Sequence, residues 1–543
     1  MRLRKTYNVG SMRCSGSATR SGIYRRDVLI RIVLLCSLFL GAIYPAAAQV
    51  STAPAASRAA ESVREFRRAN EHRILNELIE LLAIPNVATD APNIQRNAEK
   101  LKAMLEARGL RVQFLPVAGR GPAVFAELVT PGATRTAIFY AHYDGQPTDA
   151  TRWTGTKPWE PALRTKSLEA GGTLILFPST GTAYQDDWRI YARSASDDKS
   201  PIVALLAALD ALRTKKIPLA VNLKLILDSE EEAGSPNLAK VLAAHAELFR
   251  GDVLLTIDGP VHQSGGPLIF FGNRGVTDVN ITVYGPTRAL HSGHYGNWAP
   301  NPAFHLARLL ASMKDADGRV LIEGFYDDVA PLSEREKQAL AELPANDADL
   351  MHELHFSKAE GSGKKLVELI NQPSLNIRGI QSAYVGAQSQ NIIPTKAEAS
   401  LDLRLVRNID PQRQVERVVA HIRKQGFYVT SGEPTNEERE KYPFIAQVTG
   451  GPGYPASRTP IDLPVSRAVV RVVEEAMGAP VVKMPTLGGS APMYLFENMK
   501  LPVIGVPIVN HDNNQHSENE NLRLGNLWRG MEIFGALLAE LRW

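Results

Sequence analysis

Cysteine is nearly absent from this sequence, and both copies lie close to its N-terminus. The chain has 543 residues, among which only Cys14 and Cys36 are cysteines. A mature chain that begins after both of them would have no disulfide, no thiolate metal ligand and no cysteine nucleophile. The side chains left to carry chemistry in such a chain are those that present oxygen or nitrogen.

An excess of positive charge is also missing from most of the chain. The formal net charge is +4, but the first 48 residues hold eight Lys or Arg side chains and a single acid, Asp27. The remaining residues carry 53 basic and 56 acidic side chains, a net charge of −3. Because nucleic-acid binding needs a basic surface, we expect no nucleic-acid partner. The sequence also shows no internal repeat and no glycine-rich phosphate loop.

The strongest hydrophobic run belongs to the leader and is short for a membrane span. Arg25 and Arg26 precede twelve apolar residues from Ile32 to Ile43, and Ala46–Ala48 supply the small residues of a cleavage site. A spanning helix needs roughly 20 residues. We therefore predict a signal peptide over residues 1–48, export to the periplasm or beyond the cell, and no stable membrane anchor once the leader is cleaved. The alternatives are an uncleaved anchor and, for the export route, a twin-arginine signal.

The composition of 44% hydrophobic and 22% charged residues is typical of a globular chain with room for two or more domains. Residues 49–59 are rich in Ser, Ala and Pro and read as a linker. Short apolar runs then alternate with helical patterns over residues 60–274 and again over 446–543. This alternation predicts an α/β catalytic domain in two parts, built on a doubly wound, mostly parallel sheet.

The pattern changes between residues 275 and 445. Val279, Ile281 and Val283 alternate with polar residues, as do the residues from Glu398 to Leu405, and each strand precedes a helical pattern. These half-buried strands predict a smaller, inserted α+β domain of the ferredoxin-like kind. We expect the polar stretch from Asp327 to Lys365 to be a surface excursion of that inserted domain.

Acidic and histidine side chains follow several predicted strands of the catalytic domain. In a doubly wound sheet, the carboxyl ends of the strands meet at the edge where ligands bind. Converging carboxylates repel one another unless a cation neutralises them, and carboxylates with imidazoles suit zinc, manganese or cobalt. Taken singly, each motif has a plain alternative as a turn, a solvated face or a helix cap. The set that the sequence places at these strand ends is His142, Asp144, Asp228, Glu230, Glu231, Glu232, Asp258, His511 and His516, and a loop ahead of a helix adds Asp197 and Asp198.

Six ordered motifs resemble the co-catalytic zinc exopeptidase family, which includes carnosinase-type dipeptidases, glutamate carboxypeptidase, aminoacylase, acetylornithine deacetylase and succinyl-diaminopimelate desuccinylase. The match runs from about Ile74 to the C-terminus. The motifs are Tyr-Ala-His-Tyr-Asp, Ser-Ala-Ser-Asp-Asp-Lys, Glu-Glu-Glu-Ala-Gly-Ser, Leu-His-Ser-Gly-His-Tyr-Gly, Gly-Gly-Ser-Ala-Pro and His-Ser-Glu-Asn-Glu.

The resemblance implies two divalent metal ions, zinc in the first place and manganese or cobalt otherwise. It implies that Asp197 bridges both ions and that four further residues each bind one: His142, Glu232, Asp258 and His516. It further implies that Glu231 is the general base and that Asp144 orients His142. A carboxylate beside the attacking water can take its proton and pass it to the leaving amine.

The resemblance also assigns roles to the inserted domain, which in the family forms a lid and usually dimerises. It implies that His291 stabilises the developing oxyanion, often in the neighbouring subunit, and that Arg404 binds the substrate carboxylate. Gly489 and Ser490 would position substrate. The plain alternatives are a glycine-rich turn for His291 and a surface ion pair for Arg404. The long loop between Trp159 and Tyr191 departs from the family pattern and puts substrate preference in doubt.

We therefore expect an exported, homodimeric metal-dependent hydrolase that cleaves a small dipeptide or a related amide with a free carboxylate. The nearest alternative is an N-acyl-amino-acid deacylase with the same machinery and an N-acyl amino acid as its substrate. A non-catalytic peptide-binding protein is a further alternative, although such a protein would be expected to have lost Glu231 or a ligand. Ser490 does not fit a serine-hydrolase motif, because Gly-Gly-Ser-Ala-Pro lacks the final glycine of G-x-S-x-G.

Overall fold

The computed structural model describes residues 56–117, 119–344 and 346–543. The predicted signal peptide and most of the predicted linker lie outside these residues. Residues Ala53–Trp543 belong to one compact unit. Within the part of the chain that is described, no helix is both long and apolar enough to cross a membrane.

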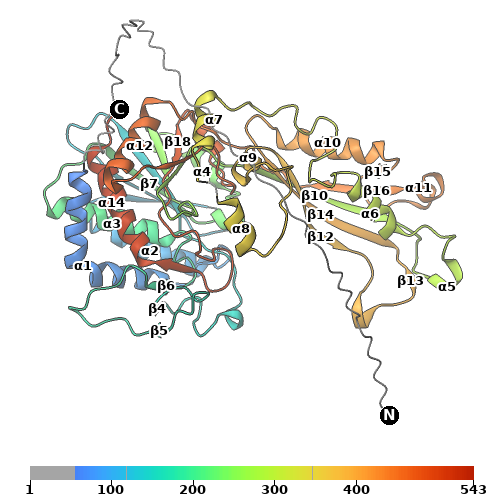
Figure 1. The fold of residues 1–543 in the computed structure, drawn as a ribbon, viewed down its shortest axis with the longest axis horizontal. Coiled ribbons are helices and arrows are strands. Elements are labelled where there is room, and N and C mark those ends of the chain that lie inside the picture. The colour runs from blue at the N-terminus through green and yellow to red at the C-terminus, as the bar shows by residue number, and fades with distance from the viewer. Residues whose placement is uncertain (1–55, 118, 345) are drawn as a thin grey trace, which may run out of the picture. The chain divides into compact units, whose positions relative to one another are not determined.

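A sheet of eight strands forms the centre of the catalytic domain (Figure 1). Its middle strands β7, β3, β8 and β18 are parallel, whereas β1 and β2 add antiparallel at one side. This confirms the predicted α/β class, with antiparallel additions at the edge. In spatial order the strands are β1 (Arg111–Leu115), β2 (Ala123–Leu128), β7 (Asn222–Asp228), β3 (Thr136–His142), β8 (Val253–Thr256), β18 (Val503–Gly505), β9 (Leu268–Phe270) and β17 (Val482–Met484).

Helices cover both faces of this sheet, because alternate residues of its strands enter two different cores. Phe139 of β3 packs with one set of helices, and Ile138 and Tyr140 pack with the other. The first set is α1 (Arg58–Leu82), α2 (Ala91–Glu106), α3 (Lys199–Thr214), α12 (Pro464–Met477) and α14 (Leu524–Glu540), and the second is α4 (Leu238–Ala244) and α13 (Tyr494–Asn498). The sheet is therefore doubly wound, as predicted.

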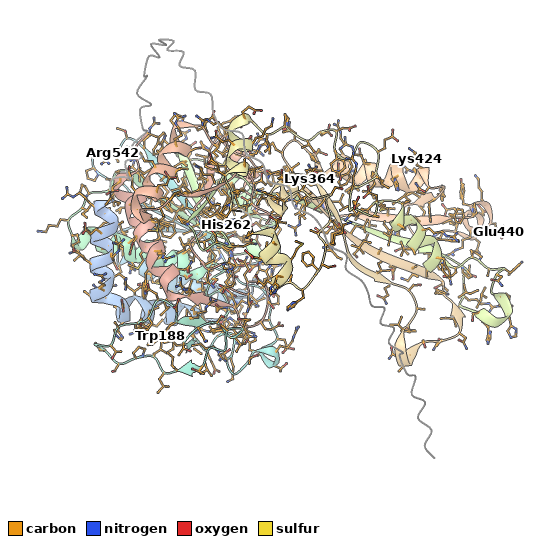
Figure 2. All side chains as sticks on the ribbon, viewed as in Figure 1. Trp188, His262, Lys364, Lys424, Glu440 and Arg542 are labelled. Carbon is orange, nitrogen blue, oxygen red and sulfur yellow. The ribbon has the colours of Figure 1, made fainter. Side chains whose placement is uncertain are left out.

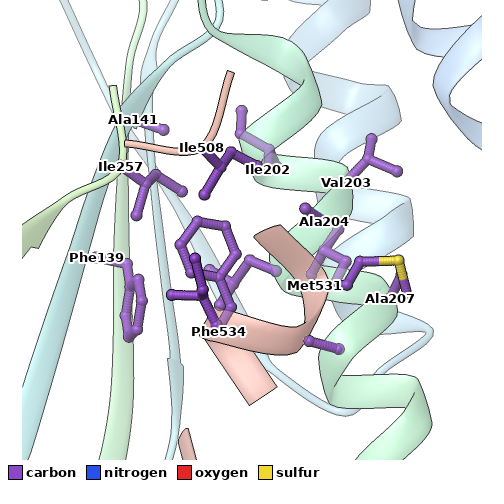
Figure 3. Packing of buried hydrophobic residues seen from close by; sticks show 14 of the residues in the cluster. Phe139, Ala141, Ile202, Val203, Ala204, Ala207, Ile257, Ile508, Met531 and Phe534 are labelled. Carbon is purple, nitrogen blue, oxygen red and sulfur yellow. The ribbon is translucent and has the colours of Figure 1, made fainter. Parts of the chain in front are cut away.

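The larger core is closed by the C-terminal helix. Figure 3 shows α3 and α14 packed beside the sheet, with Phe139 facing Phe534 of α14. Their rings meet edge to face with centroids 6.2 Å apart. Lys199, at the start of α3, is fully buried, and its ammonium donates to the carbonyls of Leu81 and Ile84 at the end of α1. This bond satisfies carbonyls that the end of a helix leaves free.

The inserted domain is a second sheet with two helices on one face, α6 (Pro302–Ala311) and α10 (Pro411–Lys424). Its chain order is β10, α6, β12, β14, α10, β16, and its strands lie side by side as β16, β10, β14, β12. This is the ferredoxin-like arrangement that the sequence predicted. The strands are β10 (Gly275–Tyr284), β12 (Ser374–Gln381), β14 (Lys396–Leu405), β16 (Ile445–Gly450) and, parallel to β16, β15 (Tyr428–Thr430). The predicted domain boundaries themselves stay a prediction.

The structure of the segment between Asp327 and Lys365 differs from the surface excursion that the sequence predicted. It forms α7 (Glu334–Ala341) and α8 (Asp347–Glu353), and α9 (Leu366–Ile370) follows it. Leu340 and Leu343 share a small core with Leu268 and Phe270 of β9 and with Met484 of β17. The prediction that this segment is purely a surface excursion of the inserted domain is therefore wrong, because its apolar residues pack on the edge of the catalytic sheet.

The loop between Trp159 and Tyr191 contains short strands of its own. They form a sheet in the order β19 (Asn521–Arg523), β6 (Arg189–Tyr191), β4 (Ala162–Arg164) and β5 (Leu174–Ile175). The remaining short elements are β11 (Leu290–His291), β13 (Ile392–Ile393), α5 (Ser292–Tyr295) and α11 (Asn436–Lys441), with single 3-10 turns η1 (Ala150–Arg152), η2 (Glu231–Ala233) and η3 (Gly386–Gln388). The pairing of β6 with β19 joins this loop to the C-terminal segment.

Candidate active site

Five of the predicted ligands form two groups that share one carboxylate. His142, Asp197 and Asp258 form one group, Asp197, Glu232 and His516 form the other, and within each group the ligand atoms all lie within 4.8 Å of one another. Asp197 Oδ1 is 2.8 Å from His142 Nε2, and Asp197 Oδ2 is 3.1 Å from His516 Nε2. Asp197 therefore directs one oxygen to each group.

The parallel strands explain why these residues meet. His142 is the last residue of β3, Asp258 follows β8, and Glu232 lies in η2, directly beyond β7. Asp197 precedes α3, and His516 lies in the loop after β18. Because the carboxyl ends of parallel strands share one edge, segments up to 374 residues apart in sequence supply one site, as the numbers of His142 and His516 show.

Asp144 holds two parts of the site in place. Its Oδ1 lies 3.3 Å from His142 Nδ1, on the side of the ring away from Asp197. Its two carboxylate oxygens also accept the backbone N–H groups of Glu231 and Glu232, each at 3.1 Å. A single buried carboxylate therefore orients the histidine ring and fixes the turn that carries the predicted general base.

The pKa shifts show how strongly charge is concentrated here. Burial raises the pKa of Asp258 to about 6 and that of Glu232 to about 8, and nearby carboxylates add to both shifts. Burial also raises the pKa of Glu231 well above its ordinary value. Asp197 goes the other way, because its hydrogen bonds to His142 and His516 outweigh burial and hold its pKa well below the usual range.

This donor set fits divalent cations. The two ligand groups together hold three carboxylates and two imidazoles, with no Lys or Arg among them. Asp197 Oδ2 is buried and lies 3.1 Å from His516 Nε2, itself a member of the second ligand group. Buried carboxylates that converge in this way repel one another unless a cation neutralises them. Oxygen and imidazole ligands without sulfur are compatible with zinc, manganese and cobalt.

Comparison with known proteins decides the family. The model of peptidase family M20/M25/M40 matches residues 138–540, which is most of the chain. The chain belongs to this peptidase family. This confirms the family resemblance seen in the six motifs, and the chain is a metallopeptidase.

The M20 peptidase has relatives that it matches over most of their length. It is 26% identical over 488 residues to the Cys-Gly metallodipeptidase dug1 of Schizosaccharomyces pombe, covering 86% of this chain and 95% of the relative. It is 25% identical over 435 residues to the human Beta-Ala-His dipeptidase, covering 79% and 78%. A solved structure, the M20 family metallo-carboxypeptidase of Sulfolobus solfataricus, matches with a TM-score of 0.71 and 28% identity, covering 86% of this chain and 98% of that one.

The predicted substrate-binding residues of the M20 peptidase meet across its two domains. Arg404 of β14 donates to Ser490 Oγ at 2.7 Å, and the carbonyl of Gly489 accepts the backbone N–H of Arg274 at 3.1 Å. Arg404 also lies 3.4 Å from Asp402, which was the plain alternative for its role. The guanidinium is half-buried and held by both partners, so it keeps a fixed position near the Gly-Gly-Ser loop.

Two other predictions fare differently. His291 lies at the junction of β11 and α5, where its ring is tilted against that of His294 with ring centroids 4.6 Å apart. No hydrogen bond or ion pair of the described residues joins it to the ligand groups of its own chain. Asp198 occupies the N-cap position of α3 without a capping bond, and its carboxylate accepts the backbone N–H of His142 instead.

Sequence reasoning gave no role to Glu520, which lies in the last of the six motifs. It is fully buried, and its Oε1 accepts the N–H groups of Ser196 and Asp197 at 2.9 and 3.0 Å. Its Oε2 accepts from Ser194 N–H and from the Arg193 guanidinium at 2.9 and 2.7 Å. The spacing of an acid four residues after His516 was the available signal, but the partners lie 323 to 327 residues earlier.

Tyr454 is a second side chain near the site that the sequence did not indicate. Burial raises its pKa well above the ordinary value, and the charge of Glu231 raises it further whereas that of Arg404 lowers it. Its ring stacks on Tyr494 with centroids 5.9 Å apart. Tyr454 is therefore close enough to Glu231 and to Arg404 for their charges to act on it, and it keeps its proton at neutral pH.

Replacing Glu520 by glutamine should weaken metal binding. The amide NH₂ would face backbone N–H donors, leaving at least one buried donor unsatisfied at a cost of about 1–3 kcal/mol. We expect a lower Tm and a weaker metal affinity by calorimetry. Glu518→Gln is the matched control, because Glu518 lies in the same loop and pairs with Arg152 rather than with the Asp197 loop. Unchanged metal affinity in Glu520→Gln would contradict the role.

Metal affinity of the M20 peptidase should rise as the pH increases from about 6 to about 9. These limits are the pKa values of Asp258 and of His516 in the absence of bound cations. Hydrogen bonding to Asp197 raises the pKa of His516, so this group, like Glu232, holds a proton at neutral pH. A cation must displace these protons, so binding releases them and weakens as pH falls. Calorimetry in two buffers of different ionisation enthalpy measures the release; a buffer-independent enthalpy would contradict it.

Proposed function

We propose that the protein is a dinuclear metal-dependent exopeptidase that hydrolyses the amide bond of a small dipeptide with a free carboxylate. The observation that carries this proposal is the pair of ligand groups that share Asp197. The names of the relatives support the substrate class, because one is a Cys-Gly metallodipeptidase and another a Beta-Ala-His dipeptidase.

Two divalent cations, with zinc proposed first, would be held by the two groups and would supply Lewis acidity to the scissile carbonyl and to water. His142 and Asp258 would hold one cation, Glu232 and His516 the other, and Asp197 both. Asp144 would keep His142 in the tautomer whose Nε2 is free to bind, because its carboxylate faces Nδ1.

Glu231 would carry the proton in the reaction. The carboxylate takes a proton from water as the water oxygen forms its bond to the carbonyl carbon. It then gives that proton to the amine nitrogen as the C–N bond breaks, so that one water is consumed and a carboxylic acid and an amine leave. Burial raises the pKa of Glu231, which makes its carboxylate a stronger base toward a proton of water.

Arg404 would bind the carboxylate of the substrate. Its bond to Ser490 places the guanidinium beside the Gly-Gly-Ser loop, and charge-assisted bonds to a carboxylate are among the stronger hydrogen bonds. A free carboxylate at a fixed distance from the scissile bond is what distinguishes an exopeptidase substrate from an internal peptide bond.

The test is hydrolysis by the mature protein, from Gln49 onward, of a mixed panel of dipeptides and N-acyl amino acids. Products are identified by mass spectrometry, with chelated and Glu231→Gln samples alongside. Dipeptide products from the metal-loaded wild type alone would support the proposal. Products from N-acyl amino acids alone would identify a deacylase. The absence of any product from all samples, despite bound metal, would indicate a binding protein.

We also propose export and a homodimer. The leader supports export, and N-terminal sequencing of the cell-envelope and medium fractions should give a chain that starts near Gln49. The strand β12 lies at the edge of its sheet and exposes Ile377 and Ile380, with Val385 exposed beyond it, which supports pairing with a second copy. Light scattering should give twice the mature mass; a monomer would also remove His291 from a role in the partner's site.

A further inference from the structure

A cavity of about 700 Å³ is lined in part by segments that are next in sequence to two of the ligands. Its inner wall includes Pro260–Gln263, which begins two residues after Asp258, and His511–Gln515, which ends directly before His516. Gly488, next to Gly489 and Ser490, lines it as well. The segments that carry a ligand of each group and the Gly-Gly-Ser loop therefore all continue into this cavity.

Its outer wall comes from the excursion and the helix that follows it. Leu350 and Leu354 are four residues apart on and just after α8, and Leu366 and Ile370 are four apart on α9. Side chains at this spacing share one face of a helix. Leu354 is 62% exposed and Leu366 is 42% exposed. These leucines leave the cavity with an apolar wall that nothing in the described chain covers.

The charge of the cavity is one-sided. Its lining has no Lys or Arg, but it includes Glu169, from the loop between Trp159 and Tyr191, and Glu353, from α8. Among the described residues neither glutamate has an ion-pair partner, whereas Asp512, also in the lining, pairs with Arg189. Burial lowers the pKa of His262, which is labelled in Figure 2, so this lining side chain is neutral at pH 7. The cavity therefore favours a cation over an anion.

We propose that this cavity binds the N-terminal residue of the dipeptide, an apolar side chain carried together with a free α-ammonium group. The inference rests on the proposed function and adds the class of substrate. The carboxylate end of the dipeptide is assigned to Arg404, so the N-terminal residue needs a separate binding site, and this cavity is lined by segments next to both ligand groups. Small-molecule pockets measure about 300–1,000 Å³, so a glycine at this position would leave most of the cavity empty.

The test of the apolar wall compares Gly-Gly, Leu-Gly, Phe-Gly and Asp-Gly as substrates of the full-length mature, metal-loaded protein. Leu-Gly and Phe-Gly should exceed Gly-Gly in kcat/KM by at least about tenfold, since a hydrophobic pocket discriminates by about that much per methylene. The Leu350→Ala/Leu354→Ala variant should reduce this ratio several-fold. Leu321→Ala is the matched control, because Leu321 is 51% exposed and does not line the cavity.

The test of the charge compares Leu-Gly with N-acetyl-Leu-Gly, which has the same side chain without the ammonium. The wild type should prefer the free amine by at least about tenfold, the factor that one lost favourable contact commonly gives. Glu169→Gln/Glu353→Gln should reduce that preference, whereas Glu334→Gln, at an exposed position on α7, should leave it as it is.

The outcomes separate the two proposals. Hydrolysis of all dipeptides with equal kcat/KM, or a ratio that the leucine variant leaves unchanged, would overturn the assignment of the cavity and leave the dipeptidase standing. Equal use of the acetylated and free substrates would overturn the ammonium part. Failure of the metal-loaded wild type to hydrolyse any dipeptide would overturn the proposed function and the cavity assignment with it.

Discussion

Replacing Glu231 by glutamine is expected to lower kcat by about 10²–10⁴-fold, the range that a general acid–base group contributes. Glutamine keeps the size of the side chain and the backbone N–H that bonds to Asp144, but it cannot take a proton from water. Steady-state kinetics on the best dipeptide of the panel measure the loss. The change should appear in kcat, because Glu231 belongs to neither of the two ligand groups.

The control for this variant is its metal content. Glu231→Gln should bind the same number of ions per chain as the wild type, measured by mass spectrometry of the metal after gel filtration. A variant that retains more than about a tenth of the wild-type kcat would exclude Glu231 as the general base. A variant that is inactive because it has lost its metal would move Glu231 into the ligand set instead.

Replacing Asp197 by asparagine should have the other large effect, because this residue alone belongs to both ligand groups. The amide nitrogen cannot ligate a cation, and the charge that offsets two cations is lost. Because Lewis-acid stabilisation is worth several kcal/mol, we expect a loss of about 10³-fold or more in kcat/KM. Metal content should fall below that of the single-group variants His142→Ala and His516→Ala.

Asp187→Asn is the matched control for this change. Asp187 pairs with Arg523 at the surface, so the same substitution there alters charge without touching a ligand group. Retention of two ions per chain by Asp197→Asn would refute the shared role of Asp197. Equal metal loss in Asp197→Asn and Asp187→Asn would show that the effect is one of net charge alone.

Much of the catalytic sheet and the ligand set was predictable because the signals are local. Strands such as β3 and β7 are mostly apolar and end in histidine or an acid, and a parallel sheet brings such ends together whatever the distance along the chain. The inserted domain was predictable for a related reason, since buried and half-buried residues alternate along β10 and along β14 after Lys396. The antiparallel strands β1 and β2 were not predictable, because the side on which a strand joins a sheet does not change the hydrophobic period of its sequence.

The features that the sequence did not predict depend on contacts between distant segments. The excursion reads as polar surface because its apolar residues are few, and only the structure shows Leu340 and Leu343 beside Leu268 and Met484. The strands β4, β5 and β6 are two or three residues long, too short to show a period. Glu520 looks like any acid in a polar loop until its four donors are seen together.

The position of Glu520 near the C-terminus has a consequence for how the protein is made. The loop that carries Asp197 is tied by this carboxylate to a segment that leaves the ribosome more than 320 residues later. Until His516 and Glu520 have emerged, the chain has the ligands of only one group and lacks the residue that holds Asp197 in place. Metal capture at both groups therefore has to wait until more than 320 further residues have been synthesised after Asp197.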